Sequence, residues 1–319
     1  MKLSPVAIGR FQPALWAVLP VLALIAAWML VDNTRLLALT VLNGLTLAGL
    51  YFLVASGFTL VFGLMRVVNL AHGSLFLLGG YVGYSAGLAT GSWLVALMAG
   101  FVAAALAGVL MQRFLFGRMV GQNMRQTLIT IGISIVMADI YLWVWGGDTY
   151  QFDAPDWLTG TVALPLVHKY AEFRLVVLAL SCVIGLGLWL LLNRTRVGMM
   201  IRAGVDDKDM LSSIGVDVER LFVITFAIGA GLAGLAGVVG GTVLSVAPGE
   251  DVRYLLASLV VVLVGGMGSI TGAAMGALLI GLAETFGQTY APTYGVVFTF
   301  VIMVAVLAFR PNGLMGKSA

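Results

Sequence analysis

Long runs without a charged residue constrain this chain more than any other feature. The run from Leu221 to Val246 contains no charge. At about 1.5 Å per residue, a helix of that length crosses a hydrocarbon layer of about 30 Å. Of the 319 residues, 61% are hydrophobic and 10% are charged, whereas a soluble domain carries roughly 25% charged residues. The sequence therefore predicts an integral membrane protein.

The same run has a competing interpretation as a dinucleotide-binding segment. A Gly-x-Gly-x-x-Gly pattern begins at Gly229, and acidic residues follow at Glu250 and Asp251, as in the fingerprint that receives a pyrophosphate. A soluble helix of that kind would have a solvated or sheet-packed face and would not carry a glycine pair at 240 and 241. We interpret these glycines as a face on which membrane helices pack closely.

Charge-free runs between short charged connections predict an all-α polytopic membrane protein with about eight transmembrane helices. A single transmembrane domain over 1–319 would contain them. The spans are expected near residues 12–31, 38–65, 69–90, 94–112, 126–145, 175–193, 221–246 and 294–309.

The charges of the connections predict which side each one faces. Arg113, Arg118 and Arg125 stand in a short connection without an acid, which is typical of a cytoplasmic loop. The connection 146–173 is mixed to acidic and is expected outside. Both termini are then expected in the cytoplasm.

The block 255–284 raises a parity problem. From an external turn at Arg253 to a cytoplasmic C-terminus the chain needs an odd number of crossings, but only two apolar blocks remain. Gly265, Gly266 and Gly268 weaken a continuous helix by roughly 1 kcal/mol each. One interpretation is a re-entrant pair of half-helices whose elbow lies beside the substrate route, since irregular backbone at membrane depth must face protein or water. The other is one unbroken helix with glycines for close packing.

Two parts of the chain share a pattern that suggests weak internal duplication. The run beginning at Asn43, "NGLTLAGLYFLVASGFTLVFG", resembles "AIGAGLAGLAGVVGGTVLS", which begins at Ala227. Each pairs a glycine-rich helix with an interrupted one. Broken helices in matching halves are typical of a substrate path in transporters.

The polar segment 194–220 is the most informative connection. It holds ten of the 31 charged residues of the chain. Within it, Met210, Leu211 and Ile214 fall on one face of a short amphipathic helix. Such a helix between two spans either is a solvated loop or docks in a groove of another protein.

Several stretches together resemble a known family. Asp209-Met210-Leu211-x-x-x-Gly215 matches the acid and the glycine of the Glu-Ala-Ala-x-x-x-Gly loop of ABC-importer permeases. The segments 42–83, 197–220, 258–284 and 309–316 are similar to branched-chain amino-acid permeases of the Liv type, particularly the H-type subunit. The similarity extends from about residue 38 to the end.

This resemblance implies an ABC-importer permease fold and a set of partners. These are a second permease subunit, two cytoplasmic ABC ATPase subunits and a periplasmic substrate-binding protein, with no nucleic acid. The chain would lie in the bacterial inner membrane and import branched-chain or related amino acids. ATP and Mg would bind the ATPase subunits, and this chain would have no cofactor of its own. The expected ATPase contacts are Arg202, Asp209, Met210, Leu211, Ile214 and Gly215.

A polar island at Asn69, His72 and Gly73 belongs to "NLAHG", which matches the family signature. The histidine is either a hydrogen-bonded packing residue or part of a hinge or pathway cluster. Asp139 and Glu284 lie in or near spans, where an ionised carboxylate is costly and therefore suggests a function. Asp139 either has such a function or is merely hydrated or paired near the interface, and Glu284 closes its apolar block and is expected to face an external vestibule.

Other function classes find less support in the residues. No Gly-x-x-x-x-Gly-Lys-Ser/Thr motif occurs, so the chain has no P-loop to hydrolyse ATP itself. A stand-alone secondary transporter or channel is the main alternative, and paired intramembrane acids and bases would favour it. A membrane enzyme would show a nucleophile–base pair, a metal cluster or acidic motifs at the membrane edge, and the sequence shows none of these.

Overall fold

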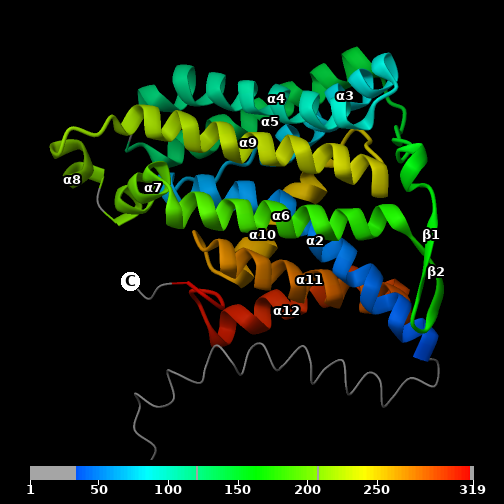
Figure 1. The fold of residues 1–319 in the computed structure, drawn as a ribbon. Helices are drawn as coiled ribbons and strands as arrows, with labels where there is room; N and C mark the ends of the chain where they lie inside the picture. The colour runs from blue at the N-terminus through cyan, green and yellow to red at the C-terminus, as the bar shows by residue number, and fades with distance from the viewer. Residues whose placement is uncertain (1–33, 120, 207, 317–319) are drawn as a thin grey trace, which may run out of the picture.

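The computed structural model describes residues 34–119, 121–206 and 208–316. The predicted span at 12–31 lies outside these ranges. The described chain consists almost entirely of helices that lie side by side along one common direction (Figure 1).

Six helices are long and apolar enough to cross a membrane. They are α2 (Thr34–Met65), α4 (Trp93–Leu110), α5 (Asn123–Trp145), α6 (Glu172–Arg194), α9 (Val218–Val243) and α11 (Ile270–Tyr290). A π turn (Met111–Leu115) and a 3-10 turn (Phe116–Met119) extend α4. Three further helices complete the bundle, namely α3 (His72–Thr90), α10 (Asp251–Gly265) and α12 (Gly295–Phe309).

The two ends of the bundle differ (Figure 1). At one end the short helices α7 (Arg196–Asp206) and α8 (Lys208–Ser213) project beyond the other helices, and the last described residues lie on the same side. At the other end β1 (Thr161–Leu164) and β2 (Val167–Ala171) form an antiparallel hairpin beside the start of α2. We call these the α7–α8 end and the hairpin end.

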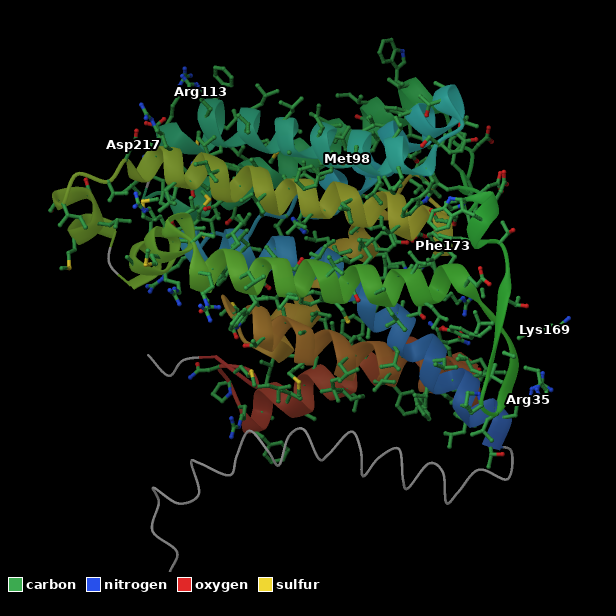
Figure 2. All side chains as sticks on the ribbon, viewed as in Figure 1. Arg35, Met98, Arg113, Lys169, Phe173 and Asp217 are labelled. Carbon is green, nitrogen blue, oxygen red and sulfur yellow. The ribbon has the colours of Figure 1, made fainter. Side chains whose placement is uncertain are left out.

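The outer helices expose large apolar side chains between the two ends. On α5, Leu128 and Val136 are largely exposed, and Met98 on α4 points away from the bundle (Figure 2). Charged side chains such as Arg113 and Lys169 lie toward the ends (Figure 2). An apolar belt between polar ends requires lipid as its solvent, so the fold is that of a multi-pass membrane protein.

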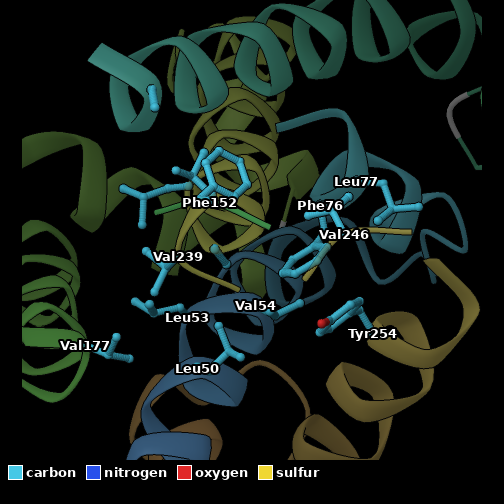
Figure 3. Packing of buried hydrophobic residues seen from close by; sticks show 14 of the residues in the cluster. Leu50, Leu53, Val54, Phe76, Leu77, Phe152, Val177, Val239, Val246 and Tyr254 are labelled. Carbon is cyan, nitrogen blue, oxygen red and sulfur yellow. The ribbon is translucent and has the colours of Figure 1, made fainter. Parts of the chain in front are cut away.

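The core forms where α2 and α9 meet the neighbouring helices. Leu50, Leu53 and Val54 of α2 pack against Val239 of α9, with Phe76 of α3 nearby (Figure 3). Glycines bring these helices close together: a Cβ on Gly79 of α3 would overlap the backbone of α9. The glycine pattern that resembles a nucleotide fingerprint is therefore a helix-packing face, as the sequence predicts.

Two helix pairs repeat the same arrangement in opposite directions. The long helix α2 runs toward the α7–α8 end and is followed by α3, which begins inside the bundle. The long helix α9 runs toward the hairpin end and is followed by α10, which also begins inside the bundle. This arrangement matches the inverted repeats of transporters and agrees with the duplicated pattern seen in the sequence.

The predicted interruption of 255–284 is present. It lies at a different place from the re-entrant elbow that the sequence led us to expect. Helix α10 ends at Gly265 and α11 begins at Ile270. Between them Gly266 and Gly268 have φ of 109° and 81°, a region that favours glycine. A Cβ on Gly63, near the end of α2, would lie 3.2 Å from Gly268 Cα. The turn thus lies at the α7–α8 end, beside the end of α2 and away from the middle of the bundle.

The missing crossing is found in 244–265 instead. Its first part, 244–250, is not helical, and α10 then supplies 15 residues, or about 22 Å at about 1.5 Å per residue. The expected turn at 247–253 is present only in its first part, where Gly249 has φ of 87°, because α10 already begins at Asp251, which is buried against α3. Together with 244–265, α11 and α12 give three crossings, which is the odd number that the charges require.

The C-terminal segment closes the α10–α11 turn. The backbone N–H groups of Leu314 and Met315 donate to the carbonyl oxygens of Val264 and Gly265, at 2.8 and 2.9 Å. These bonds satisfy carbonyls that the end of a helix leaves without partners. The stretch 309–316, which resembles the family tail, thus has a structural role.

Candidate functional site

The N-terminal ends of α3 and α10 meet inside the bundle. Ser74 Oγ donates a hydrogen bond of 3.2 Å to Asp251 Oδ2. A Cβ on Gly73 would overlap the carbonyl oxygen of Asp251, so only glycine permits this approach. Tyr141 Oη of α5 donates to the Ser74 carbonyl oxygen at 2.7 Å. This contact joins the two interrupted helices of the inverted pair at mid-bundle.

Asn69 and His72 hold the start of α3 in place. His72 is buried, and its Nε2 lies 2.9 Å from the carbonyl oxygen of Val54, well inside α2. Its ring meets Phe58 edge-on, with centroids 5.3 Å apart. Asn69 Oδ1 accepts from the Ala71 N–H at 3.1 Å. The structure places the polar island at a helix start, where His72 is a hydrogen-bonded packing residue; a hinge role stays a prediction.

A polar cavity of about 280 Å³ lies among α2, α6, α9, α10 and α11, next to the start of α6. We call it the hairpin-end cavity. Its polar lining comes from Asn43, Thr46, Arg174, Arg253, Glu284 and Gln288. Its apolar lining comes from Leu47, Leu50, Val243 and Leu244. Apart from Leu244, which follows α9, these residues come from five helices, which explains why the sequence did not predict this grouping.

The charged groups of the cavity are only partly neutralised. Glu284, 8% exposed, accepts from Tyr51 Oη at 2.7 Å and from Gln288 Nε2 at 3.1 Å. Arg174 Nη1 donates to Asn43 Oδ1. Within the described ranges, neither Glu284 nor Arg174 has an ion-pair partner, whereas Arg253 pairs with Glu250 at 3.2 Å.

The projection at the α7–α8 end contains the predicted ATPase-contact residues. Of the three apolar side chains among them, two are exposed and the third is buried. Met210 and Ile214 are 65% and 69% exposed, whereas Leu211 is only 4% exposed. Leu211 packs in a cluster with Leu64 of α2 and Leu221 of α9. The expectation that all three side chains form one docking face is therefore wrong for Leu211, since a helix of six residues must bury one side chain to stay on the bundle.

The remaining predicted contact residues surround this projection. Arg202 Nη1 donates to Asn193 Oδ1 at 2.8 Å and is exposed. Gly215 ends α8 with φ of 86°, the left-handed conformation typical of a helix C-terminus. Asp209 lies in α8, but its side chain is outside what the structure describes. The ATPase-contact role of these residues stays a prediction.

The structure separates two groups that the sequence treated as one route. Gly265, Gly266 and Gly268 lie at the α7–α8 end, whereas Asn69, His72 and Gly73 lie at mid-bundle beside Asp251. The sequence also did not predict that Arg174 and Arg253 line one cavity with Glu284. The sequence signal that could have indicated this cavity was Glu284, an acidic residue at the end of an apolar block.

The chain is similar to known proteins of one family over most of its length. The family described as "Branched-chain amino acid transport system / permease component" matches residues 40–307. The permease BraD of Pseudomonas aeruginosa is 30% identical over 293 residues, covering 86% of this chain and 94% of that protein. LivH of Escherichia coli K12 is 29% identical over 292 residues, with the same coverage. Both are named as permease proteins of high-affinity branched-chain amino acid transport systems.

A solved structure shares the fold at low sequence identity. PsaBC from Streptococcus pneumoniae, solved in complex with a Fab, is 12% identical and has a TM-score of 0.50. The match covers 92% of this chain and 97% of the other.

Proposed function

This chain belongs to the family of branched-chain amino-acid transport permeases, and we propose that it is the membrane-spanning subunit of an ATP-driven importer for such amino acids. The family match over residues 40–307 carries this proposal. The inverted helix pair and the interrupted helices at mid-bundle support it, because transporters build substrate paths from such elements.

The permease would work with subunits that this chain does not contain. We assign ATP hydrolysis to two cytoplasmic ATPase subunits and substrate delivery to a periplasmic binding protein, with a second permease completing the path. The projecting α7–α8 segment supports the ATPase contact, because its apolar side chains Met210 and Ile214 are exposed next to charged neighbours. This chain then needs no cofactor of its own.

The proposed orientation puts the α7–α8 end in the cytoplasm. Arg113, Arg118, Arg125 and Arg194 all lie at connections of that end, and cytoplasmic loops are enriched in such residues. The hairpin end would face the periplasm of a bacterial inner membrane, and the C-terminus would be cytoplasmic.

Reconstitution tests this proposal against a stand-alone transporter or channel. Proteoliposomes would contain the permease with or without its ATPase subunits, and uptake of radiolabelled leucine would be measured with ATP and binding protein present. We expect uptake only with the ATPase subunits and hydrolysable ATP. Uptake by this chain alone would overturn the proposal.

A further inference from the structure

The hairpin-end cavity combines groups of opposite charge with an apolar wall. Arg174 and Glu284 line the same space of about 280 Å³. Leu47, Leu50, Val243 and Leu244 supply apolar surface in it. Its volume is close to the lower bound of roughly 300 Å³ for small-molecule pockets, which suits a ligand the size of one amino acid.

We propose that this cavity binds the zwitterionic backbone of an amino acid in transit, with Arg174 contacting the α-carboxylate and Glu284 the α-ammonium group. This inference rests on the proposed transport function, and it assigns that function a binding site within the membrane-spanning chain. The aliphatic side chain of the substrate packs against the leucine and valine wall.

The hydrogen bonds of Glu284 leave it able to bind a cation. Tyr51 and Gln288 each donate one bond, and each carboxyl oxygen accepts one. An ionised carboxylate has about four lone-pair positions, so two remain for an ammonium group. The two donors also hold the carboxyl group in a fixed orientation at the wall of the cavity.

Arg174 is the better of the two cations for the carboxylate. Arg253 already pairs with Glu250 at 3.2 Å. Among the described residues, Arg174 donates a side-chain hydrogen bond to the neutral Asn43 Oδ1, which orients the guanidinium without neutralising it. A guanidinium has five N–H donors and binds a carboxylate through two parallel bonds.

The location of the cavity fits an early station on the route. Arg174 is near the start of α6, and Gln288 is near the end of α11, both toward the hairpin end. In the proposed orientation this is the side from which the substrate arrives. Two weak charge contacts would hold the amino acid there without trapping it.

The test compares transport with ATP hydrolysis in the complete complex. Variants Glu284→Gln and Arg174→Gln would be reconstituted with their partner subunits, and leucine uptake and ATPase rate would be measured on the same proteoliposomes. Both substitutions remove a charge, and Glu284→Gln also keeps the side-chain size. Losing one hydrogen bond to a charged group corresponds to about a tenfold change or more, so we expect leucine uptake to fall about tenfold.

ATPase stimulation by loaded binding protein should meanwhile stay within about twofold, since neither residue lies at the α7–α8 end. Arg174→Lys keeps the charge and should restore most of the uptake, which a purely structural role of Arg174 would not predict. Matched controls are Asp148→Asn in the exposed connection after α5 and Arg35→Gln at the exposed start of α2. Both should transport like the unmodified complex.

The outcomes separate this inference from the proposed function. If the unmodified complex imports leucine and both charge-removing variants match the controls, the zwitterion site is wrong and the transport function stands. If the unmodified complex imports no leucine, isoleucine or valine, the proposed function itself is wrong. Should Glu284→Gln fail to assemble, as seen from loss of its ATPase activity, the half-exposed Arg174 and its Lys variant decide the case.

Discussion

Gly57 of α2 and Gly229 of α9 pack backbone against backbone where the two central helices cross. A Cβ on Gly229 would lie 2.7 Å from the Gly57 carbonyl oxygen, and a Cβ on Gly57 would overlap the Gly229 carbonyl oxygen. The contact is reciprocal, as expected of two helices related by an inverted repeat. Close approach of this kind is the main source of attraction between helices in lipid.

The first prediction concerns this crossing. Gly57→Ala should destabilise the permease by about 1–3 kcal/mol, the usual cost of overpacking a core, because the new methyl group meets backbone that cannot rotate away. Thermal unfolding of the purified protein in detergent measures the change. Gly132→Ala is the matched control, since its Cβ would meet nothing within 4 Å, and it should be neutral or slightly stabilising. Equal midpoints for the two variants would contradict the packing.

The second prediction separates Met210 from Leu211. Met210→Asp should leave the fold intact and reduce substrate-stimulated ATPase activity severalfold, since an apolar anchor often contributes about 2 kcal/mol to an interface. Leu211→Asp should lower the unfolding temperature, because it places a charge in the cluster that holds α8. Ser212→Asp, an exposed neighbour, is the control. Normal coupling in Met210→Asp would remove this residue from the ATPase interface.

The third prediction concerns the α10–α11 turn. Gly268→Ala should destabilise the protein by about 1–2 kcal/mol, the cost of a left-handed conformation for a residue with a Cβ, because Gly268 has φ of 81°. Gly147→Ala, with open space around its Cβ and no left-handed φ, should have little effect. Unfolding midpoints in detergent check both variants. An unchanged midpoint for Gly268→Ala would show that the turn adopts another conformation in the membrane.

The fourth prediction concerns the segment that leads to α3. Thr130 Oγ1 accepts a 3.0 Å hydrogen bond from the Leu70 N–H, and Thr130 is fully buried. Thr130→Val keeps the shape but leaves that donor unsatisfied, at a cost of about 1–3 kcal/mol. Thr127→Val on the same helix removes only an exposed bond to its own helix. Thermal unfolding should separate the two variants, and a loss confined to Thr127→Val would refute the assignment.

The sequence by itself determined the membrane class and most helix positions, and it offered the α10–α11 break as one of two interpretations. A charge-free run indicates a segment that lies in lipid, and a glycine in a left-handed conformation ends a helix. Both features depend on residues that are close together in the sequence. The resemblance of 42–83 and 258–284 to a permease family likewise depends on contiguous residues. The family match over 40–307 supports it.

Only the tertiary structure decided how deeply each side chain is buried and which helices lie next to each other. The sequence placed Asp251 in an external turn, whereas Asp251 begins α10 and packs against Gly73 of α3. It placed Leu211 on a docking face, but the neighbouring helices bury it. It could not bring Arg174 and Glu284, which are 110 positions apart (284 − 174), into one cavity. Periodicity shows which residues share a face of one helix, whereas the partner of that face depends on how all the helices pack together.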